Sequence, residues 1–177
     1  MKRLSLLLAL VGLSVCSAAP ALAQWDAAEG INWLSFQEAL AEAERSGKKV
    51  MIDAYSPRCG WCRKLHEEVY TDENIRGYVN EHFVMTRLNI DERSDTLRYG
   101  GYVLPSALLA AYWGATSTPT TVFLKSDGEA ITGLPGFQKV DFFLDVMEYI
   151  ASDAVFTQSF DAYQEERGNG EPASGGR

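Results

Sequence analysis

Cys59-Gly60-Trp61-Cys62 is the stretch from which the fold of this chain can be inferred, and it closely follows the apolar run Val50-Met51-Ile52-Asp53-Ala54-Tyr55. Two thiols three positions apart can close and open a short disulfide by exchange. At the first turn of a helix, the leading thiol would lie among unpaired backbone N–H groups at the positive end of the helix dipole. That setting favours the thiolate, which is the attacking species in disulfide exchange. The tetrapeptide therefore predicts a redox site if a strand leads into it and a helix follows it.

The N-terminal residues have the pattern of a signal peptide and are not expected to belong to the fold. Lys2 and Arg3 are basic, residues 4–15 are apolar, and Ala21-Leu22-Ala23 has the small-x-small pattern of a cleavage site. The apolar run is too short to remain as a membrane span, so we expect an exported protein without stable membrane insertion. Cleavage after Ala23 would leave one domain over residues 24–163 and a polar, disordered tail over residues 164–177.

Signal-peptide cleavage also decides which thiols and charges remain. Of the three cysteines, Cys16 would be removed, which leaves Cys59 and Cys62 as the thiols of the mature chain. Lipidation of Cys16 is disfavoured because Val15 stands where a small residue is normally needed. Without Lys2 and Arg3, the 16 basic residues fall to 14 against 24 acidic ones, a formal charge of −10. That excess argues against nucleic acid or an anionic membrane surface as a partner.

Apolar periodicity predicts three main helices, over residues 32–47, 59–80 and 140–150. Ser35 and Glu38 have the spacing of a capping box at the start of the first. The second is expected to break near Thr71-Asp72, where Thr71 could cap a new segment.

Strands are expected between these helices, over residues 49–55, 83–90, 119–125 and 129–134. The order of the elements predicts an α/β fold with a mixed central β-sheet and helices on both faces. Residues 91–117 form a long connection, in which residues 104–113 are apolar enough for an extra helix.

Other kinds of site can also use a C-x-x-C pair. A c-type haem site needs His after the second cysteine, and Arg63 stands there. A structural zinc site needs four ligands, and the mature chain offers only Cys59, Cys62, His66 and His82. An inert structural disulfide would close too short a loop to constrain the unfolded chain much. The open alternative to redox exchange is a metallochaperone or redox-sensing module that holds copper or zinc through Cys59, Cys62 and His66.

A wider pattern surrounds the cysteine pair in the order and spacing of a known family. Its parts are Asp53 before Cys59, Arg87-Leu88-Asn89-Ile90-Asp91, Thr118-Pro119-Thr120, Val122-Phe123-Leu124, Asp127-Gly128 and Pro135-Gly136-Phe137. Over about residues 31–150, the chain resembles the thioredoxin family. The signal peptide and residues 33–49 are most similar to exported bacterial thioredoxin-like proteins, such as the SoxW type and the C-terminal domain of DsbD. The resemblance implies a thioredoxin-like fold with an extra helical insertion before the strand that follows a cis-proline.

The resemblance also implies catalytic roles for three residues. Cys59 would be the exposed nucleophile that forms a mixed disulfide with a partner. Cys62 would be the buried thiol that resolves this intermediate. Asp53 corresponds to the family's buried acid, which accepts or relays the proton of the resolving thiol.

Four further residues correspond to the family's substrate-binding positions. Pro119 matches the cis-proline that faces the disulfide, and Thr118 before it would bind an extended substrate segment through its backbone. Gly136 matches the loop that borders the substrate groove. Trp61 occupies a position that varies between subfamilies and is a candidate contact for partner proteins.

Basic side chains also surround Cys59 in the sequence. Arg58, Arg63 and Lys64 either favour its thiolate or form ordinary solvated surface. His66 is interpreted as a residue of the helix surface rather than as a catalyst.

With the resemblance, these residues predict a periplasmic thiol–disulfide oxidoreductase that reduces disulfides of exported partner proteins. A membrane thiol reductase of the DsbD or CcdA type would re-reduce the Cys59–Cys62 pair. The reductant direction rests on the resemblance alone, because an oxidant or isomerase would use the same residues at a different potential. We expect a monomer that needs no cofactor and no metal.

Overall fold

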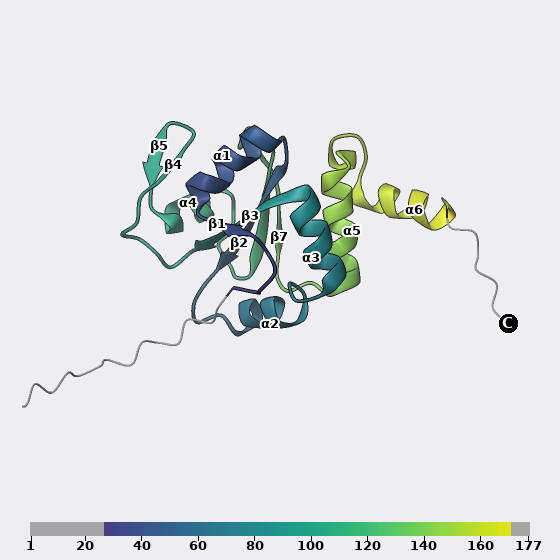
Figure 1. The fold of residues 1–177 in the computed structure, drawn as a ribbon, viewed down its shortest axis with the longest axis horizontal. Helices are drawn as coiled ribbons and strands as arrows, with labels where there is room; N and C mark the ends of the chain where they lie inside the picture. The colour runs from purple at the N-terminus through teal and green to yellow at the C-terminus, as the bar shows by residue number, and fades with distance from the viewer. Residues whose placement is uncertain (1–26, 171–177) are drawn as a thin grey trace, which may run out of the picture.

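A five-stranded mixed sheet forms the centre of the computed structural model, which describes residues 27–170 (Figure 1). Its strands lie in the order β1 (Trp33–Leu34), β3 (Phe83–Asn89), β2 (Lys49–Tyr55), β6 (Thr120–Leu124) and β7 (Ala130–Pro135). The expected signal peptide, 1–23, and the last part of the expected tail, 171–177, lie outside the described residues. β1 and β2 are parallel to β3, whereas β6 is antiparallel to both β2 and β7.

Helices cover both faces of this sheet, and the sheet separates the interior into two hydrophobic cores (Figure 1). One face carries α1 (Phe36–Ser46) and α4 (Ser106–Tyr112), and the other carries α2 (Gly60–Glu68), α3 (Glu73–His82) and α5 (Val140–Ala151). The predicted α/β architecture is confirmed, and the expected strands agree with β2, β3, β6 and β7 to within one residue at each end. Among the described residues, no helix has the length and apolar character needed to cross a membrane.

Side chains alternate along β2 between the two cores. Val50, Ile52 and Ala54 lie in the core under α1 and α4, while Met51 lies in the core under α2, α3 and α5. Asp53 is on the same side of the strand as Met51 and is fully buried. The alternation therefore places a carboxyl group on the sheet face that carries α2.

The ends of α1 follow from its capping residues. Ser35 Oγ accepts a hydrogen bond from the Glu38 N–H, and the Glu38 carboxylate accepts one from the Ser35 N–H. Gly47 ends the helix in the left-handed conformation, at φ 75°. The helix starts later than residue 32 because Trp33–Leu34 form β1 beside β3.

The break between α2 and α3 is present, but the prediction that Thr71 caps α3 is wrong. Asp72 is the N-cap, and its carboxylate accepts hydrogen bonds from the N–H groups of Asn74 and Ile75. Thr71 Oγ1 instead donates to the Glu67 carbonyl at the end of α2. A carboxylate interacts more favourably than a hydroxyl with the positive end of a helix, which explains the difference.

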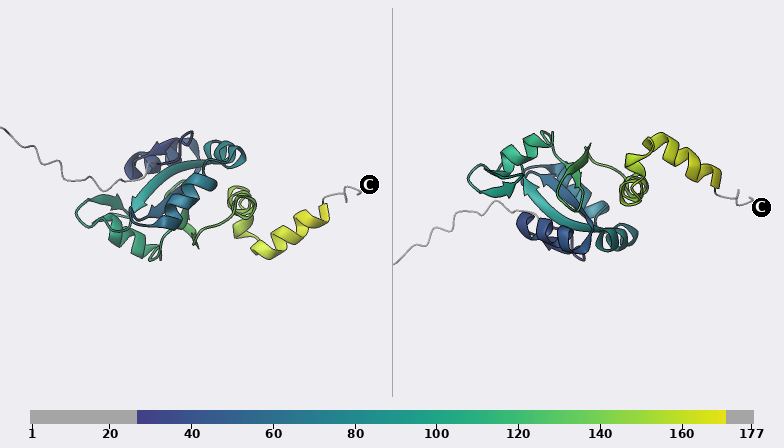
Figure 2. Two further views of the ribbon diagram at one scale, coloured as in Figure 1. Left: turned by 90° about the horizontal axis from the view of Figure 1, so that it is seen from below. Right: turned by 90° about the horizontal axis from the view of Figure 1, so that it is seen from above.

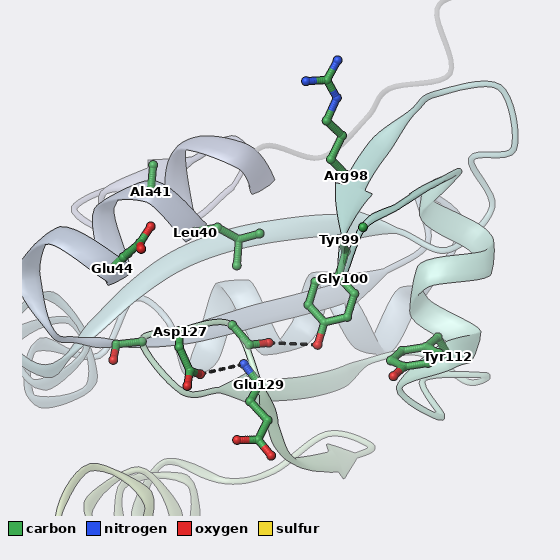
Figure 3. A pocket seen from close by; sticks show the side chains of 12 residues that line it. Leu40, Ala41, Glu44, Arg98, Tyr99, Gly100, Tyr112, Asp127 and Glu129 are labelled. Carbon is green, nitrogen blue, oxygen red and sulfur yellow. Dashed lines mark hydrogen bonds between the residues drawn. The ribbon is translucent and has the colours of Figure 1, made fainter.

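The insertion between β3 and β6 contains a hairpin as well as the expected helix. β4 (Leu97–Tyr99) pairs with β5 (Tyr102–Leu104), and α4 lies within the range expected at 104–113. The Tyr99 hydroxyl donates to the Gly128 carbonyl and ties the hairpin to the turn between β6 and β7 (Figure 3). Strands of three residues are too short to show a period in the sequence, so the hairpin was not predicted.

The tail begins as a helix, although disorder was expected from residue 164. After η1 (Ala154–Phe156), α6 spans Phe160–Gly170 and projects away from the sheet (Figure 2). Arg167 in α6 forms an ion pair with Glu148 of α5. This contact with another element helps to explain why a polar segment is helical up to residue 170.

Replacing Asp72 with alanine should lower the free energy of unfolding by about 1 kcal/mol, because two backbone N–H groups of α3 lose their acceptor. Thr71→Ala is the matched control and should change it by less than about 0.5 kcal/mol, since the N-cap stays intact. Urea denaturation followed by circular dichroism measures both variants. Equal losses for the two would contradict the assignment of Asp72 as the cap.

Candidate active site

The cysteine pair lies at the start of α2, just beyond the end of β2. Cys59 is the N-cap of α2 and forms a disulfide with Cys62, with 5.3 Å between their Cα atoms. The Cys59 sulfur accepts a hydrogen bond from the Cys62 N–H at 3.0 Å. Cys59 is half-buried, whereas Cys62 is fully buried. One sulfur is thus open to a partner at the positive end of a helix, while the other is shielded.

The loop between β2 and α2 is held in place by Asp91. Ser56 Oγ donates to Asp91 Oδ2 at 2.7 Å and accepts from the Arg58 N–H at 3.2 Å. The Arg58 guanidinium pairs with the same carboxylate oxygen, at 3.2 Å. Asp91 therefore offsets part of the positive charge that the sequence places beside Cys59.

Asp53 is buried beside two other ionisable side chains. Its Oδ2 atom lies 2.7 Å from His66 Nε2 and 3.3 Å from Arg87 Nε. The Arg87 guanidinium lies over the Tyr55 ring, 3.9 Å from the centroid. Asp53 Oδ1 has no hydrogen-bond partner among the described residues. The buried acid expected from the sequence is present, but it belongs to a cluster rather than standing alone.

His66 lies in the core, so its interpretation as a helix-surface residue is wrong. It follows Cys62 by four residues, about one turn of α2, and both side chains face the sheet. Its ring stacks on Trp33 at 5.4 Å and meets Tyr70 edge-on at 4.8 Å. Its Nδ1 atom accepts a hydrogen bond from the Ala28 N–H at 3.0 Å. The spacing from Cys62 was the signal in the sequence that could have shown this burial.

Tyr70 completes the surroundings of His66 and is itself fully buried. Burial raises the pKa of its phenol well above the ordinary value, and the negative charge of Asp53 raises it further. Tyr70 is therefore neutral at physiological pH and adds no charge to the cluster.

Thr118 and Pro119 lie at the same end of the central strands as the cysteine pair. The peptide bond between them is cis, and Pro119 immediately precedes β6. Thr120 pairs with Ala54, so the start of β6 meets the end of β2, where the chain turns toward the disulfide. The Gly136 N–H donates to the Pro119 carbonyl at 2.8 Å. The structure thus brings together three of the four residues expected to bind substrate.

Trp61, the fourth of these residues, is exposed next to the disulfide. Its side chain is 59% exposed, and its ring lies 5.7 Å from the ring of Phe137. Lys64 Nζ lies 5.2 Å from each of these two rings. Because Phe137 follows Gly136, this contact joins α2 to the loop after β7.

The ligand set required by the metal-binding alternative is not assembled. Nδ1 of His66 accepts from the Ala28 N–H, and Nε2 is bonded to Asp53, so both ring nitrogens are engaged. In the part of the chain that the structure describes, no three His, Cys, Asp or Glu side chains are placed to hold a metal ion. His66 therefore does not join Cys59 and Cys62 as a third ligand.

A separate pocket lies at the other end of β6 (Figure 3). It is bordered by α1, the β4–β5 hairpin and the turn at residues 126–129, with Leu40 and Tyr112 among its lining residues. Pro119 precedes β6, whereas the turn at residues 126–129 follows β6. The pocket and the disulfide therefore lie at opposite ends of the central strands.

Known proteins share this architecture. The family model described as thioredoxin-like domain matches residues 36–151. A thioredoxin-fold protein from Helicobacter pylori superposes with a TM-score of 0.57 at 21% identity, over 75% of this chain and 98% of that one. A thioredoxin from Thermus thermophilus superposes with a TM-score of 0.55 at 26% identity, over 68% and 87% of the two chains.

A relative by sequence is uncharacterized protein B0495.5 of Caenorhabditis elegans, 29% identical over 104 residues. The match covers 58% of this chain and 14% of that protein, so the chain spans only a small part of that relative's length. The family model, by contrast, covers well over half of the chain and includes the cysteine pair, Asp53 and Pro119. This chain belongs to the thioredoxin-like domain family.

Proposed function

We propose that this protein is a periplasmic thiol–disulfide oxidoreductase that reduces disulfides of exported proteins. The observation that carries the proposal is the disulfide between half-buried Cys59, at the N-cap of α2, and fully buried Cys62. Membership of the thioredoxin-like family and the likeness to the Thermus thioredoxin support this class of reaction. The signal-peptide pattern that ends at Ala23 supports export.

The reaction starts from the dithiol form of the pair. The Cys59 thiolate attacks one sulfur of the partner disulfide, a mixed disulfide forms, and the other partner sulfur leaves as a thiolate. Deprotonated Cys62 then attacks Cys59 Sγ, the Cys59–Cys62 bond forms, and the second partner thiolate leaves. The protein loses two electrons and two protons, and the partner gains them as two thiols.

Asp53 accepts the proton of Cys62 in the second step. Its position under α2 and the absence of a hydrogen bond at Oδ1 among the described residues support this role. Thr118 binds the partner segment beside the disulfide by backbone pairing, while Pro119 faces the disulfide and Gly136 borders the groove. Trp61 provides an exposed aromatic contact for the same partner.

The electrons must be replaced after each cycle, because the cysteine pair holds only two. A membrane thiol reductase of the DsbD or CcdA type is the donor in this proposal, since it would deliver electrons to an exported protein. The pair would meet this donor and the disulfide-bearing partners in turn through the same half-buried Cys59.

Cys62→Ser should trap partner proteins as stable mixed disulfides, because Cys59 can still attack but nothing resolves the intermediate. Diagonal gel electrophoresis under non-reducing and then reducing conditions, with mass spectrometry, identifies the adducts. Cys59→Ser is the matched control and should trap none. Equal trapping by both variants would contradict the assignment of Cys59 as the nucleophile.

The reduction potential of the Cys59–Cys62 pair should lie nearer to the roughly −270 mV of thioredoxin than to the roughly −120 mV of DsbA. A reductant needs a low potential to pass electrons to a structural disulfide. Equilibration of the protein with defined thiol–disulfide buffers measures this value. A potential close to that of DsbA would reverse the proposed direction of electron flow.

The exported protein should begin at Gln24, because cleavage after Ala23 follows the small-x-small pattern. N-terminal sequencing of the protein from a periplasmic extract tests this. Ala23→Arg should leave the precursor uncleaved. Ala27→Arg lies beyond the site and should be cleaved as the wild-type protein is. A first residue well beyond Gln24, or a protein retained in the cytoplasm, would contradict the proposed localisation.

A further inference from the structure

His66 touches the buried acid and lies one helical turn from the resolving cysteine, yet the reaction described above gives it no part. We propose that His66 is a positioning residue that aligns the Asp53 carboxylate to accept the proton of Cys62. The inference rests on the proposed function, because it concerns the resolving step of that reaction.

Hydrogen bonding fixes the protonation state of the imidazole. A backbone N–H can only donate, so His66 Nδ1, which lies 3.0 Å from the Ala28 nitrogen, carries no proton. The ring proton is therefore on Nε2, which donates to Asp53 Oδ2 at 2.7 Å. His66 is a neutral donor, and protonation of Nδ1 would break the bond from Ala28. It is thus built to orient a carboxylate rather than to act as a base.

The two donors of the cluster converge on one carboxylate oxygen. His66 Nε2 and Arg87 Nε both donate to Asp53 Oδ2, whereas Oδ1 is buried and has no hydrogen-bond partner among the described residues. The two donors occupy the lone pairs of Oδ2, whereas those of Oδ1 are unengaged among the described residues. Oδ1 is therefore the oxygen that can receive the proton.

α2 brings this arrangement to the resolving thiol. Cys62 and His66 are four residues apart, which places their Cβ atoms about 5–6 Å apart on one face of the helix. Both side chains are buried, at 0% and 3% exposure. Trp33 and Tyr70 pack against the imidazole and restrict its rotation. The direction of the Nε2–H bond, and hence of Asp53, is fixed by packing.

The groups that could influence a pH profile around His66 come from three parts of the fold. β2 supplies Asp53, β3 supplies Arg87, and α2 with the turn after it supplies Cys62 and Tyr70. Trp33 and the backbone of Ala28 contribute no charge. Tyr70 is neutral and Arg87 is always protonated, so neither of them adds a change of charge of its own to the profile.

Reaction of the reduced protein with the aromatic disulfide DTNB separates the two chemical steps. Attack by Cys59 releases the first thionitrobenzoate, and attack by Cys62 on the resulting mixed disulfide releases the second. Stopped-flow absorbance resolves both releases as a function of pH. His66→Phe keeps the aromatic packing but removes the donor, whereas His66→Gln keeps an N–H donor that cannot titrate.

His66→Phe should slow the second release by about tenfold or more at neutral pH. The first release should change little, since Cys59 is half-exposed and does not use Asp53. His66→Gln should restore most of the second rate. An unchanged second step in His66→Phe, or an equal loss in both variants, would overturn the positioning role.

Two further results keep the proposal open to refutation if His66→Phe does not fold. Nitrogen-15 NMR of the wild-type protein at neutral pH should show a neutral His66 ring with its proton on Nε2, and an imidazolium or the opposite tautomer would refute the proposal. In Ala28→Pro, which lacks the N–H, the second release should slow relative to Ala28→Gly, which retains it, and equal rates would refute the role of Ala28. Failure of the proposed function is distinct, because Cys62→Ser would then trap no partner protein, whereas both releases from DTNB and their dependence on His66 could still be measured.

Discussion

The hydrogen bond between His66 Nε2 and Asp53 Oδ2 joins the helix that carries the cysteine pair to the central strand of the sheet. A carboxylate without donors would cost several kcal/mol to bury. Here an imidazole and a guanidinium supply the donors, and the rings of Tyr55 and Trp33 cover the guanidinium. The carboxyl group can therefore be buried inside the domain, bonded to the helix that also carries Cys62.

The register of the sheet determines where this cluster forms. In the parallel pairing of β2 with β3, Asp53 lies opposite Arg87, so the two side chains share one face. The same register places Val50 opposite Val84 and Ile52 opposite Thr86 on the other face. A slip of one residue would turn Arg87 toward the core under α1 and leave the carboxylate without its guanidinium. The apolar pattern of β2 that stabilises the fold therefore also specifies the electrostatics of the site.

Features that depend on neighbours in the sequence were predictable, whereas those that depend on distant partners were not. The capping box of α1 and the buried strands β2 and β3 follow from local patterns. The same holds for the placement of Cys59 at a helix start. The spacing of His66 from Cys62 indicates its burial, but its partners Asp53, 13 residues away, and Ala28, 38 residues away, leave no local pattern. The β4–β5 hairpin and the helical part of the tail were missed because short strands and contacts with α5 leave no period in the sequence.

The two halves of the site differ in how much of the fold each one requires. The attacking half is Cys59 at the start of α2. It needs only β2, the turn after it and α2, which follow one another in the chain. The resolving half needs Asp53 from β2, Arg87 from β3, His66 from α2 and the Ala28 N–H from the segment before β1. A change that loosens any one of these contacts would leave a reactive thiol in place but disturb the acceptor for the second proton. Because a mixed disulfide that is not resolved blocks the protein, complete folding around Asp53 matters more for turnover than for the first attack.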